Sequence, residues 1–233
     1  MNTGFQLFQL QEIDSAIDKA QKRIDEITHL IENDKTTATA RKNVENCEKL
    51  FIKEKNEFEI LNSEIQSRKN KKAQSESSLY SGTISNPKEL QDLQKEIGYL
   101  TAMIAEMEDQ LFQKMIILEK AESNFNEAKS QLKIALSEFE TRKSLLIGEM
   151  NQLESSVKSQ QNQRLSITTQ IDQQAIGTYQ SLRKSKNGIA IARLDDDTCS
   201  ACGTSLNASQ RQQSRSPGTL FFCPSCGRII YGS

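Results

Sequence analysis

Near its carboxyl end the chain reads Cys199-Ser200-Ala201-Cys202-Gly203, and after a spacer it reads Cys223-Pro224-Ser225-Cys226-Gly227. Each segment separates two cysteines by two residues, a spacing at which one tight turn brings both sulfurs to the same metal ion. The glycine after each pair supplies the positive φ that such a turn commonly needs. Two such pairs with a hairpin-length spacer predict a zinc ribbon.

We predict that the four cysteines bind one structural Zn²⁺ ion: Cys199, Cys202, Cys223 and Cys226. Four thiolates complete a tetrahedral shell, whereas a catalytic zinc keeps one position open for water. The single histidine of the sequence, His29, lies far upstream, and no acidic residue follows Asp197. The composition of the tail therefore favours a metal that folds the ribbon and does no chemistry.

Two other uses of paired cysteines are less favoured. Structural disulfides need an oxidising compartment, and the first residues show no basic start followed by an apolar run of the kind that directs export. A redox C-x-x-C usually occurs singly beside a βαβ pattern. We therefore expect a cytoplasmic protein, and we expect Cys47, far from the tail, to be a small buried hydrophobe.

The first half of the chain carries a heptad pattern. Apolar residues alternate steps of three and four, which is typical of a coiled-coil seam: Leu10, Ile13, Ile17, Ala20, Ile24, Ile27 and Ile31. The pattern fails across residues 33–43 and resumes one residue out of phase as Val44, Cys47, Phe51, Glu54, Phe58, Leu61 and Ile65. We expect one continuous helix that is locally overwound or bent at this interruption.

A reversal is predicted between Tyr80 and Pro87. Gly82 can end a helix with positive φ, Asn86 is a good N-cap, and Pro87 suits the first helical position. A second heptad series follows in one phase: Leu90, Leu93, Ile97, Leu100, Ile104, Met107, Leu111, Lys114, Leu118, Ala121, Phe125, Ala128, Leu132, Ala135 and Phe139. We expect this helix to run without a break to Asn187-Gly188. Its end would overhang the first helix, and we expect the ribbon to be its partner there.

The predicted fold class is mainly α: a long antiparallel coiled-coil hairpin with a small C-terminal β zinc ribbon. Residues 1–186 would form the hairpin, with its tip near 80–87, and residues 187–233 would form the ribbon. We expect strands at 189–194, 220–222 and 228–231, a turn at Ser216-Pro217-Gly218, and one of Phe221 and Phe222 facing inward.

Composition narrows the class of protein. The 233 residues include no Trp and three Pro, with 36% hydrophobic and 26% charged residues, which is typical of a long two-faced helix. No apolar run approaches the roughly 20 residues of a membrane span. A two-helix seam encloses no pocket, so we expect neither an enzyme nor a small-molecule substrate.

The net charge is −1, but residues 183–233 alone carry +4. Their cations could contact phosphates of RNA or DNA, with an exposed aromatic residue stacking on a base: Arg183, Lys184, Lys186, Arg193, Arg211, Arg215 and Arg228. A zinc ion with four thiolates carries a charge of −2, which reduces the net positive charge of this segment. The same cations would also be expected on an ordinary solvated surface. Nucleic-acid binding is therefore an alternative interpretation.

Three motifs together resemble the bacterial C4-type zinc-ribbon proteins with a long coiled-coil hairpin: Tyr80–Leu90, Tyr179–Gly188 and Cys223–Tyr231. The resemblance covers essentially the whole chain, and its four zinc ligands match Cys199, Cys202, Cys223 and Cys226. In that family some members are tied to flagellar or secretion gene regulation, through an alternative sigma factor or through RNA. The resemblance therefore makes a sigma factor or a secretion component a candidate partner.

We therefore expect a non-enzymatic adaptor for a protein partner. Tyr80 and Ile84 would stand at the exposed tip, beyond what a turn requires, and are candidate partner contacts. The identity of the partner, the choice between RNA and DNA, the oligomeric state, and the choice between tip and ribbon as main contact surface remain open at this point.

Overall fold

The computed structural model describes residues 3–82, 84–216 and 219–232. Contacts divide the chain into two compact units, Asp34–Arg142 and the combination of Met1–Asn33 with Lys143–Ser233. The helices and strands are α1 (Thr3–Glu32), α2 (Lys35–Tyr80), α3 (Pro87–Thr168), α4 (Gln173–Ser185), β1 (Ile191–Asp195), β2 (Thr198–Cys199), α5 (Ala208–Arg215), β3 (Phe221–Phe222) and β4 (Ile229–Tyr231).

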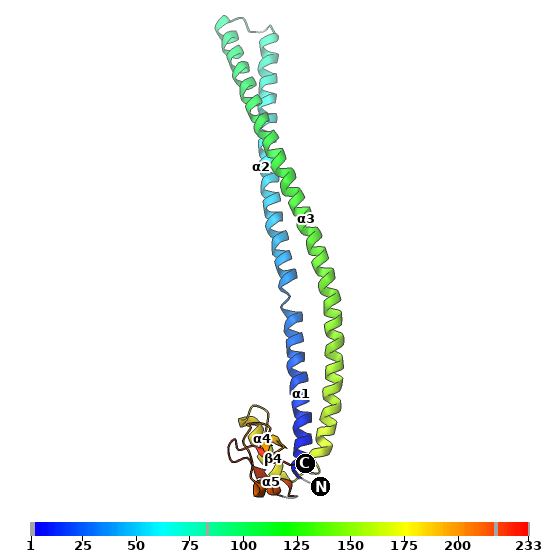
Figure 1. Ribbon diagram of the computed structural model, residues 1–233. Coiled ribbons are helices and arrows are strands. Elements are labelled where there is room, and N and C mark those ends of the chain that lie inside the picture. The colour runs from blue at the N-terminus through cyan, green and yellow to red at the C-terminus, as the bar shows by residue number, and fades with distance from the viewer. Residues whose placement is uncertain (1–2, 83, 217–218, 233) are drawn as a thin grey trace. The chain divides into compact units, whose positions relative to one another are not determined.

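The Asp34–Arg142 unit is a hairpin of α2 and the first part of α3, which run side by side in opposite directions (Figure 1). Its seam is formed by the heptad residues, and Ile65, Ile104 and Met107 are buried there together. Further along, Phe51 and Phe125 stack with ring centroids 5.8 Å apart. The hairpin and its heptad pairing are confirmed.

One layer of this seam is ionic. Glu54 on α2 is 8% exposed and accepts a 3.3 Å hydrogen bond from the ammonium of Lys114 on α3. Lys114 also pairs with Glu57. Glu54 and Lys114 are the two polar interruptions of the heptad series, so the structure places these exceptions opposite each other.

The reversal at the tip lies between Tyr80 and Pro87. Gly82 has φ of +70°, a backbone conformation that residues with a Cβ atom rarely adopt. The side chain of Asn86 accepts a hydrogen bond from the backbone N–H of Lys88, and its carbonyl accepts the N–H of Leu90. Both interactions satisfy backbone donors at the start of α3.

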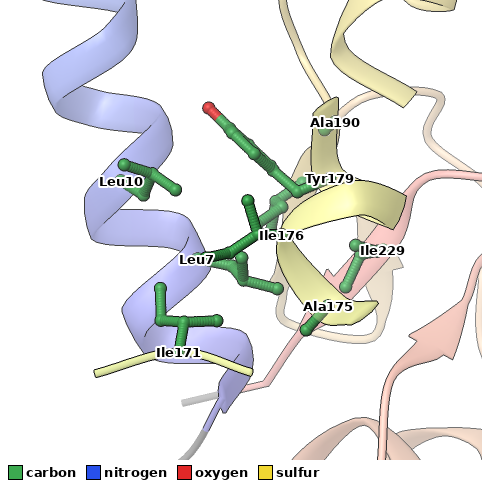
Figure 2. Close-up of a cluster of buried hydrophobic side chains, with 9 residues drawn as sticks. Leu7, Leu10, Ile171, Ala175, Ile176, Tyr179, Ala190 and Ile229 are labelled. Carbon is green, nitrogen blue, oxygen red and sulfur yellow. The ribbon is translucent and has the colours of Figure 1, made fainter. Parts of the chain in front are cut away.

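The second unit joins α1 to α4 and to the small sheet. Its helix-side core gathers side chains of α1 (Leu7, Leu10), of α4 and the residues before it (Ile171, Ala175, Ile176, Tyr179), and of the ribbon (Ala190, Ile191, Ile229). Figure 2 shows Leu7 and Leu10 of α1 facing Ile176 and Tyr179, with Ile229 behind them. The ribbon thus contacts the end of the second helical segment, as expected, and it also packs on α1, which was not expected.

The sheet has the order β2-β1-β4-β3. Strands β1 and β4 are parallel, with Ile191 opposite Ile229, while both outer pairs are antiparallel. Between the two cysteine pairs the chain forms α5, which Asn207 and Gln210 cap reciprocally. The sequence pattern did not predict this helix.

Two expectations of continuous helices were wrong. The chain leaves the helical path at Asn33 and Asp34, and the carboxylate of Asp34 accepts the N–H of Thr37 at 2.9 Å to cap α2. Similarly, α3 ends at Thr168, and Asp172 caps α4 through the N–H groups of Gln174 and Ala175. In both places an aspartate at an N-cap position starts a new helix.

The expected strands are present with shifted bounds. For example, β1 begins at Ile191 instead of Ile189. Phe221 is half-buried and packs on the ribbon core, whereas Phe222 is 42% exposed, which confirms the predicted inward and outward pair. Pro217 and Gly218 of the expected turn lie outside the described residues. Among the residues described, no helix is both long and apolar enough to cross a membrane.

Candidate metal centre

The four cysteines occupy two similar turns of the ribbon. In the first, the carbonyl of Cys199 accepts hydrogen bonds from the N–H groups of Cys202 and Gly203, at 3.2 and 2.8 Å. In the second, the carbonyl of Cys223 accepts the N–H of Gly227 at 2.9 Å. Gly203 and Gly227 have φ of +73° and +71°, so both glycines adopt the conformation that the sequence predicted.

The sulfurs of these turns converge. Cys199 and Cys226 have Sγ atoms 3.9 Å apart, Cys202 and Cys223 have Sγ atoms 3.7 Å apart, and all four lie within 4.8 Å of one another. Tetrahedral zinc with bonds of about 2.3 Å would hold sulfurs about 3.8 Å apart. The geometry fits one Zn²⁺ ion with four thiolate ligands, and Cys47 on α2 takes no part in the cluster.

The four thiols have unlike surroundings. Burial raises the pKa of Cys199 to about 12, whereas the Thr204 hydroxyl, 3.3 Å from its sulfur, helps to lower the pKa of Cys202 to about 6. Cys199 and Cys223 are buried, and Cys202 is exposed. A bound zinc ion would hold all four as thiolates and cross-link the two turns.

Around the sulfurs lies a metal-side core, which is distinct from the helix-side core. Its buried members are Ala192, Leu194, Cys199, Leu206, Cys223 and Ile230. Two of these six are themselves ligand cysteines, so the apolar part of this core is small. A ribbon of this size depends on its metal for folding.

The sheet is held on α1 by one buried glutamine. The Gln11 side-chain oxygen accepts hydrogen bonds from the N–H groups of Ala190 and Ile191, at 2.6 and 2.7 Å. Its amide nitrogen donates to the carbonyl of Ile191 at 2.8 Å. Gln11 is 7% exposed, and its amide thus pairs with the backbone at the start of β1 as a neighbouring strand would.

A buried aspartate lies one turn further along α1. Asp14 is 4% exposed; it accepts hydrogen bonds from Arg164 Nε at 2.7 Å and from the Tyr179 hydroxyl at 2.8 Å. Burial and the bond to Asp14 raise the pKa of Tyr179 well above its usual value. Arg183 completes the network with an ion pair to Asp18 and a longer one to Asp14.

The sequence interpretation missed Gln11 and Asp14. A signal was available, because Leu7, Leu10, Gln11 and Asp14 follow the spacing of a single helix face. That face shares only Leu10 with the seam of Leu10, Ile13 and Ile17. Two polar residues on an otherwise apolar face indicate partners outside the heptad seam, although they do not identify them.

The seven cations proposed for nucleic-acid contact differ in their surroundings. Three make side-chain ion pairs or hydrogen bonds within the chain: Arg183 pairs with Asp18, Arg211 pairs with Asp197, and the Arg228 guanidinium donates to the carbonyls of Ile189 and Lys186. The other four differ in exposure, with Lys184, Arg193 and Arg215 exposed and Lys186 half-buried. The guanidinium of Arg193 lies 5.7 Å from the centre of the Phe8 ring.

The two candidate tip residues, Tyr80 and Ile84, differ in exposure. Tyr80, the last residue of α2, is 83% exposed. Ile84, beyond the end of the helix, is half-buried. A large aromatic side chain thus stands in solvent at the end of the α2–α3 hairpin.

Comparison with known families gives two matches. Residues 10–187 match the CT398-like coiled coil hairpin domain, and residues 198–230 match the C4-type zinc ribbon domain. Together with the cluster of four sulfurs, the second match confirms the prediction of one structural zinc site. No curated protein sequence matches this chain significantly.

Three solved structures are similar in fold. CT398 from Chlamydia trachomatis has a TM-score of 0.83 at 18% identity, covering 99% of this chain and 98% of its own. A protein from Mycobacterium smegmatis has a TM-score of 0.77 at 18% identity and covers 100% of both chains. HP0958 from Helicobacter pylori has a TM-score of 0.54 at 16% identity, covering 98% of this chain and 96% of its own.

Proposed function

The chain belongs to the family of CT398-like coiled-coil hairpin proteins, and on that premise we propose that it is a non-enzymatic adaptor that binds a protein partner. The resemblance described above supplies the class of partner: a transcription or secretion component, such as a sigma factor. The proposal places the partner contact at the tip of the α2–α3 hairpin. The boundary between hairpin and ribbon at 186/187, and a cytoplasmic location, remain predictions.

The observation that carries the proposal is the exposure of Tyr80, 83%, at a turn that needs no aromatic residue. Gly82, Asn86 and Pro87 already account for the reversal. An exposed tyrosine offers a large apolar surface with a polar end, the combination that is enriched in protein interfaces. Ile84, two residues past Gly82, is half-buried and is the second candidate contact of the proposal.

The acidic and basic groups outside the ribbon support a non-enzymatic role. A hollow of about 300 Å³ is lined by Asp14, Asp18, Arg164, Tyr179 and neighbours on α4. Both aspartates in it are paired with arginines, and the raised pKa of Tyr179 keeps its hydroxyl protonated. A general base needs a free lone pair directed at a substrate. Here the carboxylates are ion-paired with the arginines, and Asp14 also accepts the hydrogen bond of Tyr179.

A tip contact is tested by capture with purified, zinc-loaded protein. The double variant Tyr80→Ser with Ile84→Ser is compared with Tyr99→Ser with Ile134→Ser, which removes an exposed tyrosine and isoleucine from α3, where they are 63% and 56% exposed. Native lysate is treated with nuclease before capture. We expect the tip variant to lose partners that the control variant retains, while both keep wild-type helicity by circular dichroism.

Equal capture by the two variants would remove the tip from the proposal. A truncation that ends at Lys186 tests whether the partner binds the ribbon instead. Partners that the truncated protein no longer captures bind the ribbon. A photo-crosslinking group at position 80 then identifies the protein that contacts the tip. The same group at position 99 is its control.

Nucleic-acid binding through the ribbon is the second candidate. The exposed Lys184, Arg193 and Arg215, together with Phe222 at 42% exposure, favour it, whereas the internal pairing of Arg183, Arg211 and Arg228 weakens it. Binding through phosphates would fall steeply with salt. A fluorescent single-stranded RNA or DNA that binds independently of salt, or not at all at low salt, would exclude this candidate.

A further inference from the structure

The two central strands of the ribbon belong to two cores at once. Along β1, Ile191 faces the helix-side core, whereas Ala192 and Leu194 face the metal-side core. Along β4, Ile229 and Ile230 divide in the same way. Because successive side chains of a strand point to opposite faces, one sheet connects the cysteine cluster to α1.

On the metal side this sheet has little apolar support. Cys199 ends β2, which pairs with β1 through Leu194 opposite Cys199. The N–H of Cys223 donates to the carbonyl of Arg228 just before β4. A zinc ion bound by the four cysteines would therefore cross-link segments on both sides of the β1–β4 pair.

On the helix side the same strands, together with α4, cover the N-terminal part of α1. Leu7 and Leu10 are 0% exposed, as are Ala190 and Ile229. All three hydrogen bonds of the Gln11 amide end on Ala190 and Ile191. If β1 loses its order, the Gln11 amide loses these partners and the apolar face of α1 is uncovered.

We propose that the zinc site controls a latch between the ribbon and α1. With zinc bound, β1 and β4 pack beside α4 on Leu7 and Leu10, and Gln11 hydrogen-bonds the start of β1. Without zinc, the strands lose their order, the contact opens, and this face of α1 becomes exposed to solvent. The exposed ligand Cys202 is the point at which a chelator or thiol reagent reaches the site.

The coupling is reciprocal, because two equilibria that share one sheet must affect each other by the same factor. Weakening the contact with α1 therefore weakens zinc binding, although Gln11 is no ligand. This consequence separates the latch from a ribbon that merely folds with its metal. The proposal does not depend on the identity of the adaptor's partner.

The first test uses the absence of tryptophan from the sequence. Phe8 stacks on Tyr231 with centroids 5.8 Å apart, and Phe51 stacks on Phe125 at the same distance. Phe8→Trp therefore reports on the latch, and Phe125→Trp is its matched control in the hairpin. Zinc is removed from the full-length protein by chelator, and its loss is verified by metal analysis.

We expect the emission of the Phe8→Trp variant to shift to longer wavelength when zinc leaves, and that of the Phe125→Trp variant to stay constant. An unchanged emission at position 8 in metal-free protein would overturn the proposal. If a tryptophan variant fails to fold, amide hydrogen exchange of the unmodified chain serves as the measurement. The exchange rate at Leu7–Asp14 should increase on zinc removal, and protection that persists there contradicts the latch.

The second test measures zinc affinity by competition with a chromogenic chelator. Gln11→Ala leaves the buried N–H groups of Ala190 and Ile191 without their acceptor, and we expect affinity to fall about tenfold. Gln21→Ala removes an exposed glutamine from the same helix and should leave the affinity unchanged. Wild-type affinity in the Gln11→Ala variant would overturn the reciprocal coupling and with it the latch.

Discussion

The hydroxyl of Tyr179 on α4 donates a 2.8 Å hydrogen bond to the carboxylate of Asp14 on α1, 165 residues earlier in the chain. The other carboxylate oxygen accepts a 2.7 Å bond from Arg164 near the end of α3. One buried aspartate thus joins three helices. A charged acceptor that is desolvated in this way makes each of its hydrogen bonds costly to lose.

Replacing Tyr179 by phenylalanine should destabilise this unit. The substitution keeps the ring in the helix-side core but removes a hydrogen bond to a charged group, which contributes about 1.5–3 kcal/mol. We expect the free energy of unfolding, measured with denaturant, to fall by about 2 kcal/mol. Tyr80→Phe, at a tyrosine that is 83% exposed, should leave the unfolding free energy unchanged.

Stability should also fall at alkaline pH because of the same tyrosine. Burial and the bond to Asp14 raise the pKa of Tyr179 in the folded protein, so the folded state retains a proton that the unfolded state loses. The stability contribution is complete below the unfolded tyrosine pKa of about 10 and is lost as the pH rises beyond it. Denaturant unfolding between pH 9 and 11 measures this slope, and the slope should be shallower in Tyr179→Phe; equal slopes would contradict it.

The ionic layer of the hairpin seam predicts opposite results for single and double substitutions. Lys114→Ala leaves Glu54, which is 8% exposed, without its cross-helix partner and should lower the melting temperature. Replacing both Glu54 and Lys114 by leucine should restore or raise it, since apolar residues avoid the desolvation of both charges. Circular dichroism melts measure both.

Lys49→Ala serves as the control for that series. Its ion pair with Glu45 lies on the surface, with the Lys49 side chain 71% exposed, and surface pairs contribute little. A melting temperature lowered equally by Lys49→Ala and Lys114→Ala would show that burial of Glu54 does not determine the effect.

Zinc content should depend on the ribbon cysteines and not on Cys47. Cys223→Ser replaces a ligand that is 2% exposed and should reduce the metal content from one zinc ion per chain to near zero, because three thiolates leave the structural site open. Cys47→Ser, on α2, should retain the full zinc content by elemental analysis. Retention of zinc by the Cys223→Ser variant would contradict the assignment of that ligand.

Much of the fold follows from short-range patterns. Heptad spacing predicts the α2–α3 seam, and every heptad residue named from the sequence is buried or half-buried. Gly82, Asn86 and Pro87 predict the reversal. The cysteine spacing and the two following glycines predict the metal turns, whose sulfurs converge as zinc requires. In each case the spacing of residues close together in the sequence carries the signal.

The breaks in the helices were harder to predict from the sequence. Asp34 and Asp172 end the continuous paths that periodicity predicts, because each carboxylate caps the following helix. An aspartate inside a polar stretch is compatible with either a helix interior or a cap. Helix α5 was missed for a related reason, since a short polar helix has no apolar period to recognise.

The sequence by itself therefore determined the zinc ligands, the hairpin and its tip, because these depend on local spacing and conformational preference. Only the tertiary structure decided which strands lie on α1, that Gln11 pairs with Ile191 across 180 residues, and that Asp14 joins Arg164 to Tyr179. The physical reason is that a buried hydrogen bond depends on two groups meeting in space, and local periodicity contains no information about partners so distant along the chain.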